Sequence, residues 1–92
     1  MDLFKLINDK KTTIVDVRTP QEFSENRVET SINIPLNVIP EKIKELKEMQ
    51  PIVMCCAAGI RSGQAVEFLK SNGFGEVYNG GSWNDVLNML EN

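Results

Sequence analysis

Two adjacent cysteines, Cys55 and Cys56, are the strongest candidates for nucleophilic chemistry in this chain of 92 residues. The sequence contains no histidine, which excludes imidazole bases, histidine–zinc sites and Ser–His or Cys–His pairs. Any reaction must therefore use a thiol, a carboxylate, a lysine or an arginine. The two cysteine Cα atoms can be only about 3.8 Å apart across a trans peptide, which is below the usual disulfide range. We therefore expect free thiols and a reducing, cytoplasmic location.

The segment around Cys56 has the composition of an anion site beside a thiol. Residues 52–55 are predicted to form a buried strand, and the side chain that follows such a strand lies where open α/β sheets bind ligands. Cys56 occupies that position, whereas Cys55 on the strand is predicted to fill the core. The small residues 57–59 would allow successive N–H groups to turn toward one anion, and the following helix adds the positive end of its dipole.

Reactivity at Cys56 depends on how far its pKa is lowered. A thiol with an unperturbed pKa of about 8.5 is only about 3% ionised at pH 7, and a drop of two units would make about three-quarters of it reactive. That drop needs about 2.7 kcal/mol. A helix terminus supplies about 0.3 to 1 kcal/mol, and at most about 2, so loop N–H groups and the Arg61 guanidinium would have to contribute the rest. The residues predicted to bind substrate are Arg61, Ala57, Ala58, Gly59, Ile60 and Ser62.

The order of the expected elements places this segment in an α/β domain. Short β-branched runs alternate with amphipathic runs of helix length, which is typical of βαβ units around a mainly parallel sheet. The predicted strands cover residues 13–17, 32–34, 52–55 and 76–78. Helices are predicted near residues 2–8, after Pro20, from Pro40 to about residue 49, over 61–72, and from Ser82 onward. We therefore expect one domain over residues 1–92, with a four- to five-stranded sheet and helices on both faces.

Residues 56–62, Cys-Ala-Ala-Gly-Ile-Arg-Ser, resemble the active-site loop of rhodanese-like domains. The shared features are a cysteine, four residues and an arginine, with glycine third after the cysteine. Other similar segments, in the family's order, are Ile14–Arg18 with Pro20, Glu22 and Phe23, Ile32–Leu36, Glu67–Leu69, Gly73-Phe74, Val77–Gly81 and Trp83. The resemblance implies a rhodanese fold and a sulfurtransferase in which Cys56 cycles between thiolate and persulfide.

The same resemblance defines the expected substrates. They are a thiosulfate-like or persulfide sulfur donor and a thiol or cyanide acceptor, with a protein persulfide as an alternative donor or acceptor. We expect no cofactor and no metal. Arg61 is the only cation of a loop that many efficient thiosulfate users make more basic, so we expect a persulfide to be the better donor. Residues 26–31 also depart from the Gly-His-Ile-Pro-Gly-Ala stretch of many members, which puts substrate contacts through that segment in doubt.

Asp16 and Arg18 lie at the end of the first predicted strand, near the same sheet edge. They are interpreted as a structural ion pair or, as the alternative, as substrate contacts, and Arg18 could pair with Glu22 four residues later. Trp83 is predicted to belong mainly to the core, and its family position suggests that it borders the pocket.

Two other functions remain open from the sequence. Five residues separate Cys55 from Arg61, which is the spacing used by cysteine phosphatases and arsenate reductases, although Gly59 is then fourth after the cysteine. The other alternative is a non-enzymatic module in which Cys56 stores or senses persulfide.

The composition disfavours some partners. Ten Lys and Arg residues against thirteen Asp and Glu give a net charge of −3, the wrong sign for binding nucleic acid through its phosphates. The longest nearly apolar run, residues 52–60, is about half the length of a membrane span. We therefore expect a monomer that binds neither nucleic acid nor membrane.

Overall fold

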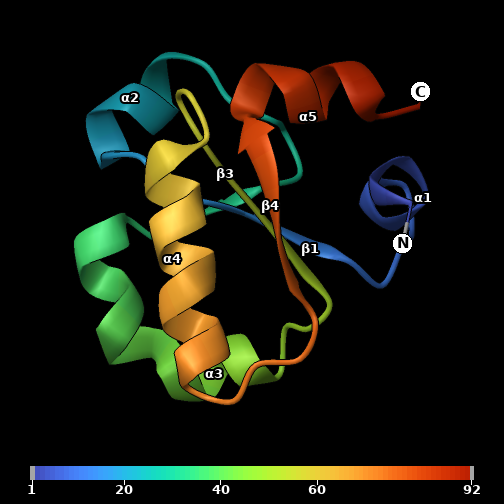
Figure 1. The fold of residues 1–92 in the computed structure, drawn as a ribbon. Coiled ribbons are helices and arrows are strands. Elements are labelled where there is room, and N and C mark those ends of the chain that lie inside the picture. The colour runs from blue at the N-terminus through green and yellow to red at the C-terminus, as the bar shows by residue number, and fades with distance from the viewer. Residues whose placement is uncertain (1, 92) are drawn as a thin grey trace.

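The structure is a computed structural model that describes residues 2–91. Its elements are α1 (Leu3–Ile7), β1 (Thr13–Asp16), α2 (Pro20–Glu25), β2 (Ile32–Asn33), a 3₁₀ helix η1 (Leu36–Lys42), α3 (Ile43–Lys47), β3 (Ile52–Cys56), α4 (Ile60–Ser71), β4 (Val77–Ser82) and α5 (Trp83–Met89). The four strands form one parallel sheet in the order β2-β1-β3-β4 (Figure 1). The predicted α/β class and parallel sheet are therefore confirmed, with four strands.

Each face of the sheet has its own apolar core. On one face, β-strand residues such as Val15 and Met54 pack with residues of α4, η1 and α3. On the other, Ile14 and Val53 pack with residues of α1 and α5. Figure 1 shows α3 and α4 on one side of the sheet and α1 and α5 on the other. Because successive strand side chains point to opposite faces, this alternation follows directly from the sequence of β1 and β3. It also places Cys56 in the core on the α4 face of the sheet, here called the α4 core, and Cys55 in the core on the opposite face, here called the α5 core.

Helix α4, which follows the cysteine loop, has well-defined ends. Gly59 precedes it with a φ of 91°, a left-handed conformation that glycine adopts without a Cβ penalty. At the other end, Gly73 has a φ of 87°, and the N–H of Phe74 donates to the carbonyl of Leu69. The predicted end of this helix at residue 72 is therefore confirmed, with Asn72 as the C-cap.

The structure differs from the predicted element boundaries in two informative places. Strand β3 continues through Cys56, because Cys55 and Cys56 pair with Gly81 and Ser82 of a β4 strand that is longer than predicted. Cys56 is thus the last residue of the strand rather than the first residue after it. The boundary predicted at Cys55 was therefore one residue short.

The prediction that Pro40 opens an α-helix was wrong. Pro40 lies inside η1, and the α-helix begins at Ile43. Proline has no N–H, so Pro40 cannot donate the α-helical hydrogen bond to the carbonyl of Leu36, and the α-helix does not extend back through it. Strands β1 and β2 each end one residue earlier than predicted. Within residues 2–91, no helix has the length and apolar character needed to span a membrane.

Candidate functional site

The end of β3 carries Cys56 into a short loop that encloses its sulfur. Cys56 is 1% exposed, whereas the side chains of Ala57 and Ala58 are exposed and Ile60 is 72% exposed. The loop closes at Gly59, and α4 begins at the next residue. The thiol is therefore held beneath a surface of small and apolar side chains.

Hydrogen-bond donors converge on the Cys56 sulfur. The backbone N–H of Gly59 donates to Sγ at 2.9 Å, and the Ser62 hydroxyl lies 3.3 Å from the same atom. Burial raises the pKa of the Cys56 thiol, but hydrogen bonds from the Ser62 hydroxyl and from the N–H groups of Ser62, Ala58 and Gly59 bring that pKa below its usual value. The loop therefore favours the thiolate, which is the nucleophilic form of cysteine.

Cys55 has the opposite environment. It is fully buried in the α5 core, and this burial, with Asp16 nearby, raises the pKa of its thiol to about 12. Cys55 is therefore a packed side chain with no access to the loop, as its position on a strand predicted.

Arg61 forms an ion pair that the sequence analysis did not anticipate. Its Nη1 and Nη2 lie 2.8 and 3.0 Å from the two carboxylate oxygens of Glu22 in α2. The hydrogen bonds from Arg61 and from the backbone of Thr19 hold the pKa of Glu22 at about 2, and the same pair raises the pKa of Arg61. The donors that lower the Cys56 pKa most are backbone N–H groups and Ser62, not the guanidinium. A substrate contact through Arg61 stays a prediction.

Asp16 and Arg18 form a buried ion pair with each other, which agrees with the structural role predicted for them. Both are buried, and Arg18 Nη2 lies 2.8 Å from Asp16 Oδ2. The guanidinium also donates to the carbonyl of Asn26 at 2.6 Å and lies 5.2 Å from the centre of the Trp83 ring. The suggested pairing of Arg18 with Glu22 was wrong, because Arg18 faces Asp16 and Glu22 faces Arg61.

Residues 26–31, which depart from the family pattern, have structural contacts in this chain. Val28 is buried in the α5 core, and the hydroxyl of Ser31 donates to its carbonyl at 2.7 Å. The carbonyl of Asn26 binds Arg18. The segment therefore contributes one side chain to the core and one hydrogen-bond acceptor to Arg18.

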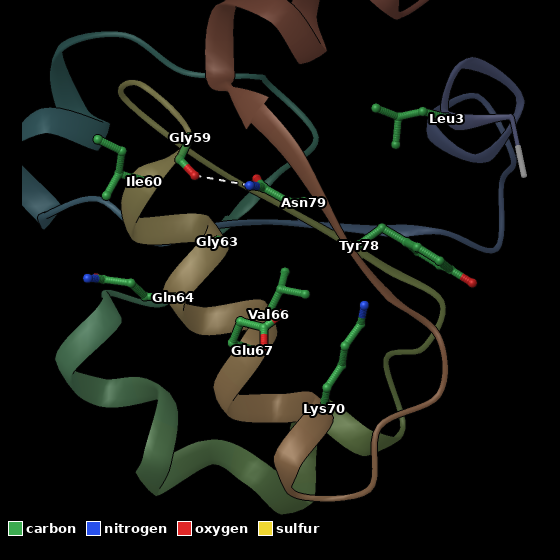
Figure 2. Close-up of a pocket in the computed structure, with 10 residues that line it drawn as sticks. All are labelled: Leu3, Gly59, Ile60, Gly63, Gln64, Val66, Glu67, Lys70, Tyr78 and Asn79. Carbon is green, nitrogen blue, oxygen red and sulfur yellow. Dashed lines mark hydrogen bonds between the residues drawn. The ribbon is translucent and has the colours of Figure 1, made fainter.

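Two residues of the site, Glu22 and Asn79, were not recognised from sequence as parts of it. Asn79 Nδ2 donates to the carbonyl of Gly59 at 3.0 Å (Figure 2), and its Oδ1 lies 2.7 Å from the Ser62 hydroxyl. No spacing rule links Asn79 or Glu22 to the loop, because they lie on β4 and α2. Their only sequence signal was membership in the segments that resemble the family.

A groove runs from the loop along α4 and β4 (Figure 2). Gly59 and Ile60 form its end nearest the cysteine, and Tyr78 and Lys70 lie farther along it. Cys56 is not among the residues that line it. Among residues 2–91, no three His, Cys, Asp or Glu side chains are grouped so that they could hold a metal ion.

Comparisons with known proteins identify what the chain is similar to. The family model for the rhodanese-like domain matches residues 2–88. A rhodanese-related protein from Thermoplasma volcanium is 37% identical, with a TM-score of 0.76 over 95% of this chain and 85% of that one. Thiosulfate sulfurtransferase PspE of Escherichia coli (strain K12) is 35% identical over 78% of this chain and 71% of its own length.

A further relative carries a different activity in its name. The tRNA uridine(34) hydroxylase of Pelagibacter ubique (strain HTCC1062) is 39% identical over 96% of this chain. The chain spans only 30% of that relative's length. The similarity therefore concerns one domain-sized part of the hydroxylase.

Proposed function

Because the chain belongs to the rhodanese-like domain family, we propose that it is a sulfurtransferase that carries sulfane sulfur on Cys56 as a persulfide. The observation that carries this proposal is the enclosure of Cys56 Sγ by the Gly59 N–H at 2.9 Å and the Ser62 hydroxyl at 3.3 Å. These two hydrogen-bond donors stabilise a sulfur anion at the position where a sulfur-donating substrate would meet the loop.

The reaction is an exchange of S–S bonds in two steps. The Cys56 thiolate attacks the outer sulfur of a donor persulfide, a new S–S bond forms, and the donor's own bond breaks with its electron pair leaving on the donor thiolate. An acceptor thiolate or cyanide then attacks the outer sulfur of the Cys56 persulfide. The Sγ–S bond breaks and its electron pair returns to Sγ, which regenerates the thiolate.

The charges around the loop support a persulfide as the preferred donor. Arg61 is the only cationic residue of the loop, and both of its terminal nitrogens bind the Glu22 carboxylate. The exposed side chains of Ala57, Ala58 and Ile60 are uncharged. A dianionic donor such as thiosulfate therefore gains little electrostatic attraction, whereas a persulfide with one charge and an apolar body can contact this surface.

Intact-mass measurement tests the proposal directly. We expect the reduced protein to gain the mass of one sulfur atom after exposure to a low-molecular-weight persulfide, and to lose that mass on addition of cyanide with release of thiocyanate. Cys55→Ser should behave like the native chain, and Cys56→Ser should gain no sulfur. Loading that persists in Cys56→Ser would refute the assignment of Cys56.

The amount of thiocyanate released per chain separates an enzyme from a persulfide-storing module. An enzyme should release thiocyanate over many cycles in excess donor and cyanide, whereas a storage module should release about one equivalent per chain. The phosphatase alternative requires Cys55 as the nucleophile. Cys55 is buried and its thiol has a pKa of about 12, and both properties argue against that role.

The second candidate function is hydroxylation of uridine 34 in tRNA. It is favoured by the 39% identity to a protein of that name, and its weakness is that the chain spans only 30% of that relative. Incubation of the purified chain with tRNA, followed by nucleoside analysis for hydroxylated uridine, distinguishes the two candidates. The net charge of −3 leads us to expect no modified nucleoside from this chain alone.

A further inference from the structure

The Ser62 hydroxyl lies between two acceptors. Its oxygen is 2.7 Å from Asn79 Oδ1 and 3.3 Å from Cys56 Sγ, and Ser62 is fully buried. A hydroxyl group carries one hydrogen, so Ser62 can donate to only one of these atoms at a time. Asn79 and Cys56 therefore compete for the same donor.

The orientation of the Asn79 amide is set by two further hydrogen bonds. Nδ2 donates to the Gly59 carbonyl at 3.0 Å (Figure 2), and Oδ1 accepts the N–H of Gly81 at 3.0 Å. In a reversed amide, Oδ1 would face the Gly59 carbonyl oxygen, so that two acceptors would meet. Nδ2 would face the Gly81 N–H, so that two donors would meet. The oxygen of Asn79 thus faces Ser62 as an acceptor.

We propose that Asn79 is a positioning residue that accepts the Ser62 hydrogen bond while Cys56 is a thiol or persulfide, and releases it when Cys56 becomes a thiolate. This inference rests on the proposed function, in which Cys56 is the nucleophile. In the thiolate state the hydroxyl turns to Sγ, and Asn79 Oδ1 keeps the Gly81 N–H. In the persulfide the charge moves to the outer sulfur, so Ser62 returns to Asn79.

This competition limits how far the thiolate is stabilised. Asn79 accepts the Ser62 hydrogen bond while Cys56 is a thiol, and it therefore stabilises the thiol relative to the thiolate. The Cys56 pKa is then higher than it would be without the Asn79 side chain. Since nucleophilicity falls as the pKa of a thiol falls, an acceptor that offsets part of the stabilisation preserves reactivity.

The loop has supports that do not depend on Asn79. The Gly59 carbonyl also accepts the N–H of Gly63 at 3.1 Å, as the first hydrogen bond of α4. A Cβ at Gly59 would lie only 3.3 Å from the Cα of Gly81, so the loop packs directly on β4. Removal of the Asn79 side chain should therefore change the Ser62 hydrogen bond more than the position of the Gly59 N–H.

The pH dependence of Cys56 alkylation by iodoacetamide, followed by intact mass, tests this competition without any sulfur donor. In Asn79→Ala we expect the Cys56 pKa to fall by about 0.4 to 1 unit, the equivalent of one neutral hydrogen bond. Ser62→Ala should raise that pKa. Adding Asn79→Ala to Ser62→Ala should produce no further change, because the shared hydroxyl is gone.

Several outcomes would overturn the inference. The first is a Cys56 pKa that is unchanged or raised in Asn79→Ala. The second is a Cys56 pKa that falls as much when Asn79→Ala is added to Ser62→Ala as when it is added to the native chain. If Asn79→Ala does not fold, Asn79→Asp decides: its carboxylate should raise the Cys56 pKa, and the rise should be smaller without the Ser62 hydroxyl. Equal rises in both backgrounds would refute the role of Ser62. Failure of sulfur loading with the expected pKa pattern would refute only the proposed function.

Discussion

Arg61 binds both carboxylate oxygens of Glu22, at 2.8 and 3.0 Å, and so joins the start of α4 to α2 beside the cysteine loop. The two residues are 39 positions apart in sequence, and both side chains remain about one-third exposed. A bidentate pair of this kind orients the guanidinium and neutralises the only cation of the loop. Under the proposed function, we therefore expect the selection of a sulfur donor at Cys56 to depend on Glu22 as well as on the loop.

Release of Arg61 should improve the use of thiosulfate. In Glu22→Gln the guanidinium loses its charged partner, and we expect the KM for thiosulfate to fall about two- to fivefold, in line with the energy of an exposed ion pair. Steady-state kinetics with cyanide as acceptor measure this change. Glu25→Gln is the matched control, because it removes the same charge from the exposed end of α2. A similar fall in both variants would mean that net charge, not Arg61, is responsible.

The ion pair should also make stability depend on pH at low pH. The Glu22 pKa is lowered from 4.5 to about 2, so its contribution is complete above about pH 4.5 and is lost as the pH falls through about 2. Because the pair is partly exposed, we expect Glu22→Gln to lower the free energy of unfolding at pH 7 by at most about 1 kcal/mol. Urea unfolding at pH 7, 4 and 2 should show the difference between native and variant chains shrinking toward pH 2. A constant difference across this range would contradict the assigned pair.

The two cysteines should differ sharply in reactivity. Hydrogen bonds lower the pKa of Cys56 below its usual value, whereas burial raises that of Cys55 to about 12. At pH 8 we expect iodoacetamide to modify the native chain and Cys55→Ser once, and to leave folded Cys56→Ser unmodified. Addition of denaturant should expose the second thiol of the native chain. Rapid modification of folded Cys56→Ser would show that Cys55 is accessible.

Gly80 is a position where any side chain should destabilise the fold. A Cβ there would lie 2.7 Å from Val53 Cγ1 and 2.8 Å from Val86 Cγ2, inside the α5 core. We expect Gly80→Ala to lower the free energy of unfolding by about 1 to 3 kcal/mol, the usual effect of overpacking. Gly75→Ala is the control, since its Cβ would meet no atom within 4 Å. Equal stability of the two variants in urea unfolding would contradict this packing.

The sequence by itself determined the α/β class and the parallel sheet, and it predicted that Cys55 and Cys56 have different environments. Residues 52–56 form a continuous apolar run, which is typical of a strand buried on both faces. Successive side chains of a strand point to opposite faces, so only one of two adjacent cysteines can face α4. The small residues 57–59 and the glycine before α4 likewise indicate a tight anion-binding loop. These features are local in the chain, and local geometry follows from residue type and spacing.

Only the tertiary structure decided which side chains surround that cysteine. The separation of four residues suggested a pair between Arg18 and Glu22, yet Arg18 binds the buried Asp16 and Glu22 binds Arg61. Asn79 reaches Gly59 and Ser62 because β4 lies beside β3, a pairing between strands more than twenty residues apart. Contacts of this kind depend on how the chain crosses between strands and on which buried charge needs a partner. Periodicity and spacing specify neither, so the hydrogen bonds around the Cys56 sulfur became visible only in the folded chain.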